Sequence, residues 1–129
     1  MPTRRVVVDH LTIGVADLDR SVAFYVAALA PLGMGVLNDR RPDVQDVAFG
    51  PEGIDDFVVS AEHAVGRNHV AFAADSRAEV DAFHAAALAA GGTDNGVPGI
   101  RTAYSPGYYG SFVLDPDGHN IEAVFHEPA

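Results

Sequence analysis

The chain has 129 residues, which is enough for one compact domain but too few for two independently stable large ones. Its net charge is −10 and all eight basic residues are arginine, which disfavours nucleic acid or an anionic membrane as a partner. Because cysteine is absent, disulfides and thiolate metal ligands are excluded, and any metal must be held by His, Asp or Glu. The sequence has no apolar stretch typical of a signal peptide or a membrane span, so we expect a soluble, cytoplasmic protein.

The first half of the chain predicts a strand, a helix and then further short strands. Val6 to Val8 lead into a β-branched run from His10 to Val15, which predicts a strand. Asp17 or Asp19 can cap the helix that follows, in which apolar residues recur at helical spacing. The better strand candidates after this helix are residues 47–49 and 57–59.

The second half repeats this order. Residues 69–74 are another apolar strand candidate, and Ser76 can cap a helix that carries one apolar stripe. Gly91 and Gly92 close this helix. We expect a long loop around Asn95 to Pro106 before the final strands, the last of which follows the turn DPDGHN.

The two halves are also similar in sequence. An offset of 59 residues aligns DHLTIGVADLDRSVAFYVAAL, from Asp9, with NHVAFAADSRAEVDAFHAAAL, from Asn68. An offset of 65 aligns AFGPEGIDDFVV, from Ala48, with VLDPDGHNIEAV, from Val113. Neither half could bury its sheet alone, so the halves should pack into a single domain, residues 1–129. We place module one at about residues 6–62 and module two at about residues 66–127.

Three side chains could converge if the two halves face each other across a cleft. His10 and His69 take equivalent places in the first strand of each half, and Glu122 lies on the last strand. Two imidazoles and one carboxylate neutralise one of the two charges of a divalent cation and leave positions open for water or an oxygen-bearing substrate. A histidine in an apolar strand is often structural, but the repeat and the costly carboxylate favour a metal. The set suits one divalent ion of Fe, Mn, Ni, Co or Zn.

Several residues near this predicted site could contact a small-molecule substrate. Alternation along the first strand places Thr12 on the side of the first histidine, and a segment rich in tyrosine precedes Phe112. Arg101 could pair with an anionic substrate group or be a surface charge. Either Tyr108 or Tyr109 faces the cleft, depending on where the strand starts. The full set of candidates is Thr12, Phe57, Arg101, Tyr104, Tyr108, Tyr109 and Phe112.

The remaining histidines are weaker ligand candidates. His119 in the turn DPDGHN and His126 near the end of the sequence are expected to be exposed to solvent. His84 falls on the second helix, where packing or a surface position accounts for it, and His63 lies in the segment between the halves. The predicted metal site therefore uses none of these four.

The chain resembles the vicinal oxygen chelate superfamily, which includes glyoxalase I, extradiol dioxygenases, fosfomycin resistance transferases and bleomycin resistance proteins. The segments that carry the resemblance are DHLTIGVADLDRSVAFY, HVAF and FVLDPDGHNIEAV. It covers nearly the whole chain and implies an α+β fold in which two paired βαβββ modules form a cupped mixed sheet around a divalent metal. By the same resemblance the ligands are His10, His69 and Glu122, and we expect a homodimer with the site at or near its interface.

The chain also departs from individual members of this superfamily. Glyoxalase I-like members have a further glutamate ligand at a position matched here by Phe57, whose neighbour Asp56 should face the other way. Fosfomycin transferases share the His, His, Glu pattern and the threonine matched by Thr12, but this chain has no lysine and has Phe112 in place of their tyrosine. Most extradiol dioxygenases have a longer chain. All three substrate classes are therefore disfavoured.

These observations leave three hypotheses. The first is a metal-dependent enzyme of the glyoxalase or dioxygenase kind, acting on a small substrate that chelates the metal through oxygen atoms. The second is a metal-independent protein of the bleomycin-resistance kind that sequesters a small molecule, for which the net charge of −10 favours a cationic ligand. The third is a structural or regulatory module. The predicted triad favours the first.

Overall fold

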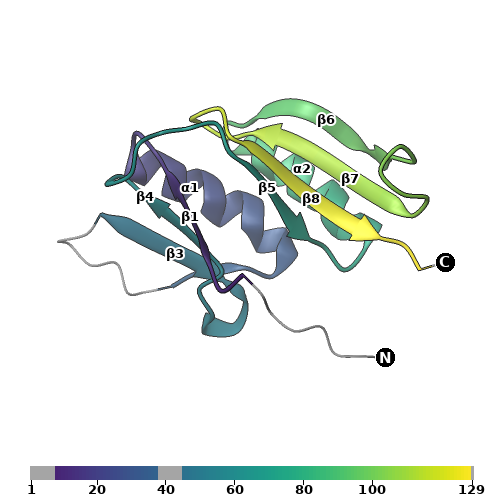
Figure 1. Ribbon diagram of the computed structural model, residues 1–129, viewed down its shortest axis with the longest axis horizontal. Helices are drawn as coiled ribbons and strands as arrows, with labels where there is room; N and C mark the ends of the chain where they lie inside the picture. Colours follow the sequence, from purple (N-terminus) through teal and green to yellow (C-terminus); the bar gives the residue numbers. More distant parts are fainter. Residues whose placement is uncertain (1–7, 38–44, 129) are drawn as a thin grey trace.

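The computed structural model describes residues 8–37 and 45–128 and has the predicted α+β fold of two paired βαβββ modules (Figure 1). The first module contains β1 (Leu11–Gly14), α1 (Leu18–Leu29), β2 (Gly35–Val36), β3 (Asp46–Gly50) and β4 (Phe57–Ser60). The second contains β5 (His69–Ala73), α2 (Arg77–Ala89), β6 (Thr93–Ile100), β7 (Tyr108–Leu114) and β8 (Asn120–His126). Val6 and Val7, predicted to lead into the first strand, lie outside the described residues.

Both helices begin at predicted capping residues. The Asp17 carboxylate accepts a hydrogen bond from the Arg20 amide at 3.1 Å, and the Ser76 hydroxyl accepts one from the Glu79 amide at 3.1 Å. The chain leaves α1 through a short 3₁₀ turn that ends at Gly33, whose φ of 76° is the left-handed conformation that glycine adopts without strain. In the described part of the chain, neither helix is long and apolar enough to cross a membrane.

The strands form two four-stranded sheets, in the orders β1-β4-β3-β2 and β5-β8-β7-β6. In each sheet the first strand of the module runs parallel to its last strand, and the other pairs are antiparallel. Among the described residues, β1 and β5 therefore each have a strand partner on one side and an open edge on the other. An open edge presents unpaired backbone groups to any strand that can reach it.

Strand register corrects one predicted correspondence between the modules. Phe57 pairs with Leu11, whereas Ile121 pairs with Val70, which is the repeat equivalent of Leu11. Phe57 therefore corresponds to Ile121, and the predicted match of Phe57 to Glu122 is wrong by one residue. The Pro-x-Gly spacing shared by the turns before β4 and β8 drew the sequence alignment one residue away from the strand register.

The core is continuous between the two modules. One side of each sheet packs on the helices, and α1 packs against α2 (Figure 1). The Phe57 ring is 1% exposed and lies with its centre 5.0 Å from the Tyr25 ring and 5.2 Å from the Phe72 ring. Because Phe72 belongs to the second module and Phe57 and Tyr25 to the first, this aromatic cluster joins the two halves.

A second connection between the modules runs through the turn from Asp115 to His119. The Tyr25 hydroxyl donates to Asp115 Oδ2 at 2.5 Å. His119 Nε2 lies 2.9 Å from the Gly14 carbonyl oxygen, and His119 Nδ1 accepts from the Asn68 amide at 3.1 Å. The prediction that His119 is exposed is wrong, since the residue is fully buried and both ring nitrogens bind backbone groups of neighbouring strands.

This turn sets the relative direction of β1 and β5. One ring nitrogen of His119 contacts Gly14, at the end of β1, and the other contacts Asn68, just before the start of β5. The end of β1 therefore lies near the start of β5. The two strands run in opposite directions in Figure 1, so their starting ends lie far apart. His10 comes four residues before Gly14, about 13 Å away along an extended chain. His10 and His69 therefore lie at opposite ends of this pair of edge strands.

The first half of the long loop predicted around Asn95 to Pro106 is strand. Residues 93–100 form β6, which pairs with β7 and shifts register between Gly96 and Gly99. Glycine and proline at 96, 98 and 99 removed the alternation of apolar and polar residues by which a strand is recognised, so the sequence indicated a loop. The connection between the two strands contains residues 101–107 alone.

We predict that Tyr25→Phe destabilises the protein by about 1–3 kcal/mol, because the buried Asp115 carboxylate loses its hydroxyl donor. The matched control is Tyr104→Phe at a tyrosine that is 65% exposed, which should change stability by less than about 0.5 kcal/mol. Urea unfolding of both variants measures the difference. Equal stabilities would show that the bond between Tyr25 and Asp115 does not hold the modules together.

Candidate functional site

A buried carboxylate lies on the open side of the second sheet. Ile121 and Ala123 of β8 face the core, so Glu122 between them points away from α2, and yet it is 1% exposed. Glu122 Oε1 lies 2.8 Å from His69 Nε2 on β5, and Glu122 Oε2 accepts a hydrogen bond from the Tyr108 hydroxyl on β7. Three strands therefore bring an imidazole, a carboxylate and a phenol together.

The neighbourhood of Glu122 leaves space for its side chain. A Cβ atom at Gly110, next to it on β7, would lie 3.3 Å from Glu122 Oε2 and 3.2 Å from the Tyr108 ring. Because β7 begins at Tyr108, alternation puts Tyr108, Gly110 and Phe112 on this side of the sheet, as predicted for an early strand start. Tyr109 faces the opposite side, where its hydroxyl donates to Asp81 of α2.

The environment of Tyr108 keeps its phenol protonated. Burial raises the pKa of Tyr108 well above its ordinary value, and the hydrogen bond and negative charge of Glu122 raise it further. The Tyr108 ring also lies 5.0 Å from the Tyr104 ring and 5.2 Å from the His126 ring. Tyr108 therefore remains a hydrogen-bond donor to Glu122 across the neutral and mildly alkaline range.

His10 does not join this group within one chain. It is exposed just before β1, with its Nδ1 atom 2.8 Å from Asp9 Oδ1. This hydrogen bond is the main reason why the pKa of His10 is raised. Thr12 is also exposed, two residues further along the same side of β1. Of the three predicted metal ligands, the structure thus pairs His69 with Glu122 and leaves His10 apart.

One other group brings three possible metal ligands together. Among the described residues, Asp115, Asp117 and His119 have ligand atoms within 4.8 Å of one another, so this group could hold a metal. Its atoms are already engaged, however, since Asp115 Oδ1 accepts from two backbone amides of the turn and the His119 ring nitrogens bind Gly14 and Asn68. An ion there would have to displace the bonds that connect the two modules.

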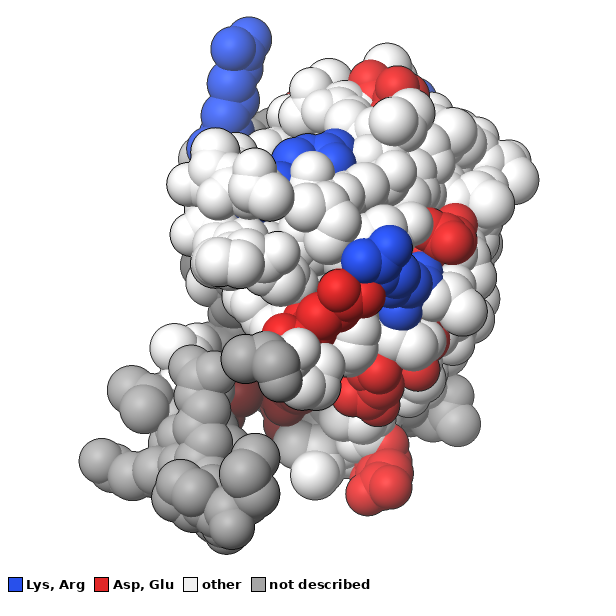
Figure 2. Space-filling model, turned by 90° about the vertical axis from the view of Figure 1, so that its right-hand side faces the viewer, with Lys and Arg blue, Asp and Glu red and all other residues white. Residues whose placement is uncertain are grey.

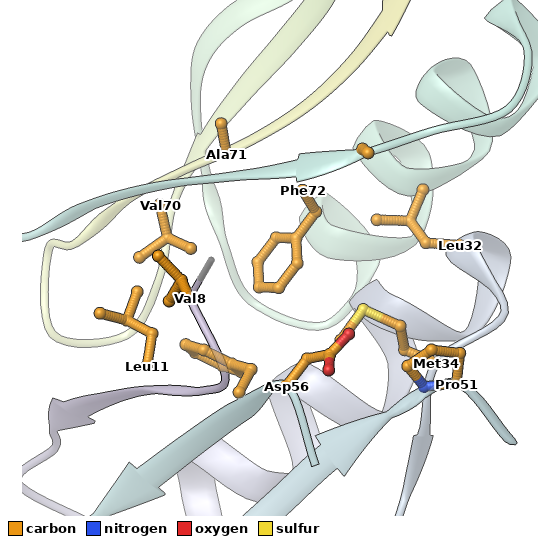
Figure 3. Close-up of a pocket in the computed structure, with 11 residues that line it drawn as sticks. Val8, Leu11, Leu32, Met34, Pro51, Asp56, Val70, Ala71 and Phe72 are labelled. Atoms are coloured by element: carbon orange, nitrogen blue, oxygen red, sulfur yellow. The ribbon is translucent and has the colours of Figure 1, made fainter. Parts of the chain in front are cut away.

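An apolar pocket of about 410 Å³ lies between the modules (Figure 3). It is lined by Val8, Leu11, Leu32, Met34, Pro51, Asp56, Phe57, Val70, Ala71, Phe72 and Ala73. Asp56 is the charged side chain in this lining; it is exposed, and Figure 3 shows it beside Met34. Phe57, predicted to contact substrate, is part of the wall of this pocket and does not lie beside Glu122.

Phe112 pairs with Glu122 across β7 and β8, and the other two candidates, Arg101 and Tyr104, contact Phe112 and Tyr108. The Phe112 ring centre is 6.2 Å from the His69 ring centre and 5.5 Å from the Arg101 guanidinium carbon. Tyr104 is largely exposed in the connection between β6 and β7.

On the face that Figure 2 shows, acidic and uncharged side chains separate the arginines, so that face has no continuous basic surface.

Sequence reasoning missed two features of this site. Strand pairing does not predict the hydrogen bond from Tyr108 to Glu122, because Tyr108 pairs with His126 whereas Glu122 pairs with Phe112, and the long Tyr108 side chain reaches back along the sheet to the carboxylate. Asn120 lies two residues before Glu122 on the same side of β8, and alternation alone would have included it.

The comparisons with known proteins agree with this architecture. The family model for the glyoxalase/bleomycin resistance protein/dioxygenase superfamily matches residues 7–123. A glyoxalase/bleomycin resistance protein from Albidiferax ferrireducens is 31% identical with a TM-score of 0.78, covering 91% of this chain and 97% of that chain. A comparison with curated proteins found no match.

Two further solved structures share the fold at lower identity. A glyoxalase/bleomycin resistance protein/dioxygenase family enzyme from Burkholderia phytofirmans is 19% identical, with a TM-score of 0.72 and coverage of 93% of this chain and 98% of that chain. A lactoylglutathione lyase from Agrobacterium tumefaciens is 21% identical, with a TM-score of 0.68 and coverage of 95% and 96%. At these identities the likeness concerns the fold alone.

We predict that Glu122→Gln lowers the pKa of Tyr108, because it removes the negative charge that opposes formation of the phenolate, while burial still holds the pKa above its ordinary value. The measurement is the ultraviolet absorbance of tyrosinate during a pH titration, with the curve of Tyr108→Phe subtracted. Glu62→Gln, at an exposed carboxylate, is the charge-matched control and should leave the curve unchanged. Identical titrations of Glu122→Gln and the unmodified protein would contradict the contact between Glu122 and Tyr108.

Proposed function

Because the chain belongs to the glyoxalase/bleomycin resistance protein/dioxygenase superfamily, we propose that it is a divalent-metal-dependent enzyme that acts on a small, oxygen-chelating substrate. The observation that carries this proposal is the 2.8 Å contact between His69 Nε2 and the buried carboxylate of Glu122. His69 and Glu122 of one chain would hold the ion together with His10 of a second copy. Iron, manganese, nickel, cobalt and zinc all suit this set of ligands.

The paired residues fit a metal site chemically. A buried carboxylate is costly unless it is paired, and Glu122 is held in place by donors on both of its oxygen atoms. When bound, a divalent ion supplies a Lewis acid that stabilises negative charge developing on substrate oxygen atoms. Tyr108 keeps the outer oxygen of Glu122 in position, as partners of metal-bound carboxylates commonly do. Glu122 is 1% exposed, whereas 53% of the His69 side chain is exposed, so an ion or a substrate can approach the pair from the His69 side.

The arrangement of β1 and β5 supports a site shared between two copies. Within one chain, His119 holds Gly14, at the end of β1, near His69. His10 lies before the start of β1, about 13 Å from Gly14, so it cannot reach the pair. Both strands have open edges in the described sheets, and a twofold dimer can bring the β1 edge of one copy to the β5 edge of the other. Such a dimer would contain two equivalent sites.

A second function is favoured by the apolar pocket between the modules. It would act, as in the metal-independent hypothesis, by capturing a small molecule without chemistry. The pocket volume of about 410 Å³ is in the usual range for small ligands, and Asp56 would attract a cationic group to its apolar walls. The name of the similar structure from Albidiferax ferrireducens, a glyoxalase/bleomycin resistance protein, is compatible with either function.

We predict that the protein binds about one cobalt(II) ion per chain, as measured by calorimetric titration after chelator treatment. His69→Ala, Glu122→Gln and His10→Ala should each weaken binding at least about a hundredfold, since loss of a ligand costs more than loss of a supporting partner. His63→Ala, at an exposed histidine outside the site, should bind as the unmodified protein does. Unchanged cobalt binding in the first three variants would contradict the proposed site.

The shared site can be tested by mixing two variants that have each lost cobalt binding. In a heterodimer of His10→Ala with Glu122→Gln, one site has all its ligands and the other lacks two. Random exchange of subunits should restore about a quarter of the sites of the unmodified protein, whereas each variant alone has none. Mixing that restores no cobalt binding, after subunit exchange has been confirmed by mass spectrometry, would show that the site does not cross a dimer.

The capture function makes a separate prediction. A quaternary amine with an aromatic body, such as benzyltrimethylammonium, should bind in the presence of EDTA and lose at least about tenfold in affinity in Asp56→Asn. Asp55→Asn, at the neighbouring exposed carboxylate, is the matched control. Fluorescence or calorimetric titration measures the affinities. Failure of the amine to bind would remove this second function.

A further inference from the structure

A second, polar pocket lies beside the His69–Glu122 pair. It has a volume of about 320 Å³ and is formed between the β6–β7 hairpin and the start of β8. Its lining residues are Asn95, Gly96, Arg101, Tyr104, Phe112 and Asn120. Arg101 is the cation in this lining, in a chain whose net charge is −10. A half-buried guanidinium in such a pocket requires a physical explanation.

The hairpin is shaped to hold the Arg101 side chain. The guanidinium carbon lies 5.5 Å from the centre of the Phe112 ring, and Nη2 donates to the Val97 carbonyl at 2.6 Å. A Cβ atom at Gly96 would come within 3.3 Å of Nη2, and one at Gly99 within 3.0 Å of Nη1. The glycines at the irregular part of β6 thus leave the room that the guanidinium occupies.

Arg101 has donors to spare. A guanidinium has five N–H donors, and among the described residues Arg101 makes one hydrogen bond and has no carboxylate partner. Arg77, by contrast, pairs with Glu127. The side-chain Nδ2 of Asn95 donates to Asn120 Oδ1 at 3.2 Å, which leaves the side-chain Nδ2 of Asn120 on the pocket lining as a further donor. The pocket therefore offers donors and one positive charge.

The pocket and the His69–Glu122 pair share a wall. The Phe112 ring lies between them, with its centre 6.2 Å from the His69 ring on one side and 5.5 Å from Arg101 on the other. Asn120 and Glu122 are two residues apart on the same side of β8. One small molecule can thus place a group against Arg101 and another against His69 and Glu122.

We propose that this pocket binds an oxyanion, a carboxylate or a phosphoryl group, carried by the substrate whose other oxygen atoms reach the His69–Glu122 pair. Planar guanidinium groups bind both kinds of oxyanion through two parallel hydrogen bonds, and the Asn120 amide adds a third donor. The connection to the metal rests on the proposed function, but binding of the anion itself does not. The substrate class is therefore a small acid with a chelating pair of oxygens.

The test is an NMR titration of the full chain with inorganic phosphate and, separately, with malonate, in EDTA and at constant ionic strength set with chloride. Binding of either anion is followed by the chemical shifts of the backbone amides of Asn95, Gly96 and Asn120. We expect saturable shifts in the unmodified protein and in Arg20→Gln, a charge-matched control on α1. Arg101→Gln should weaken binding at least about tenfold, and Arg101→Lys should fall between the two. The anion that binds more tightly distinguishes a phosphoryl from a carboxylate substrate.

Two results would overturn the proposal. One is equal affinity in Arg101→Gln and the unmodified protein, provided that the spectrum of the variant shows a folded chain. The other is a set of shifts that do not saturate or that chloride alone reproduces. Glu122→Gln separates this proposal from the proposed function, because it should lose cobalt binding and retain anion binding. If the unmodified protein binds the anion and takes up no cobalt, the metal site is refuted and the oxyanion pocket stands.

Discussion

The rest of the structure depends on the hydrogen bonds of the turn from Asp115 to His119. His119 binds the end of β1 and the residue before β5, and Asp115 binds Tyr25 of α1. The bonds to Gly14 and Tyr25 are buried and the bond to Asn68 is partly buried, so an imperfect fit would leave polar groups unpaired, which costs more than the bonds contribute. They therefore fix one relative position of the two modules, in which β1 and β5 run in opposite directions.

That direction decides what one chain can build alone. The second sheet brings His69, Glu122 and Tyr108 together from three adjacent strands, while His10 lies at the far end of β1. The buried carboxylate is therefore satisfied by hydrogen bonds from its own sheet. A ligand set that includes His10 needs a second chain, and the open edges of β1 and β5 are where a second chain can approach.

The sequence predicted the elements well where local signals are strong. Asp17 and Ser76 cap the helices, and the apolar runs at β3, β4 and β5 are strands. It failed where the signal is not local. The burial of His119 depends on Gly14, 105 residues away, and the pairing of β6 depends on backbone groups of β7 that no side-chain pattern reveals. The contact between His69 and Glu122 comes from the parallel pairing of β5 with β8, and the separation of His10 from them comes from the turn.

The two modules share a fold but differ in their polar side chains, and this difference explains why the candidate site lies on the second sheet. Val58 pairs with Thr12 in the first sheet as Glu122 pairs with Ala71 in the second, so the first sheet has an apolar residue where the second has its carboxylate. The first module can thus contribute a histidine but not the buried acid of a second, equivalent site. Arg101 and its glycine-rich strand likewise belong to the second module. Duplication supplied a scaffold with two similar sheets, and among the described residues it is the second sheet that holds a carboxylate, a phenol and a cation within reach of one small molecule.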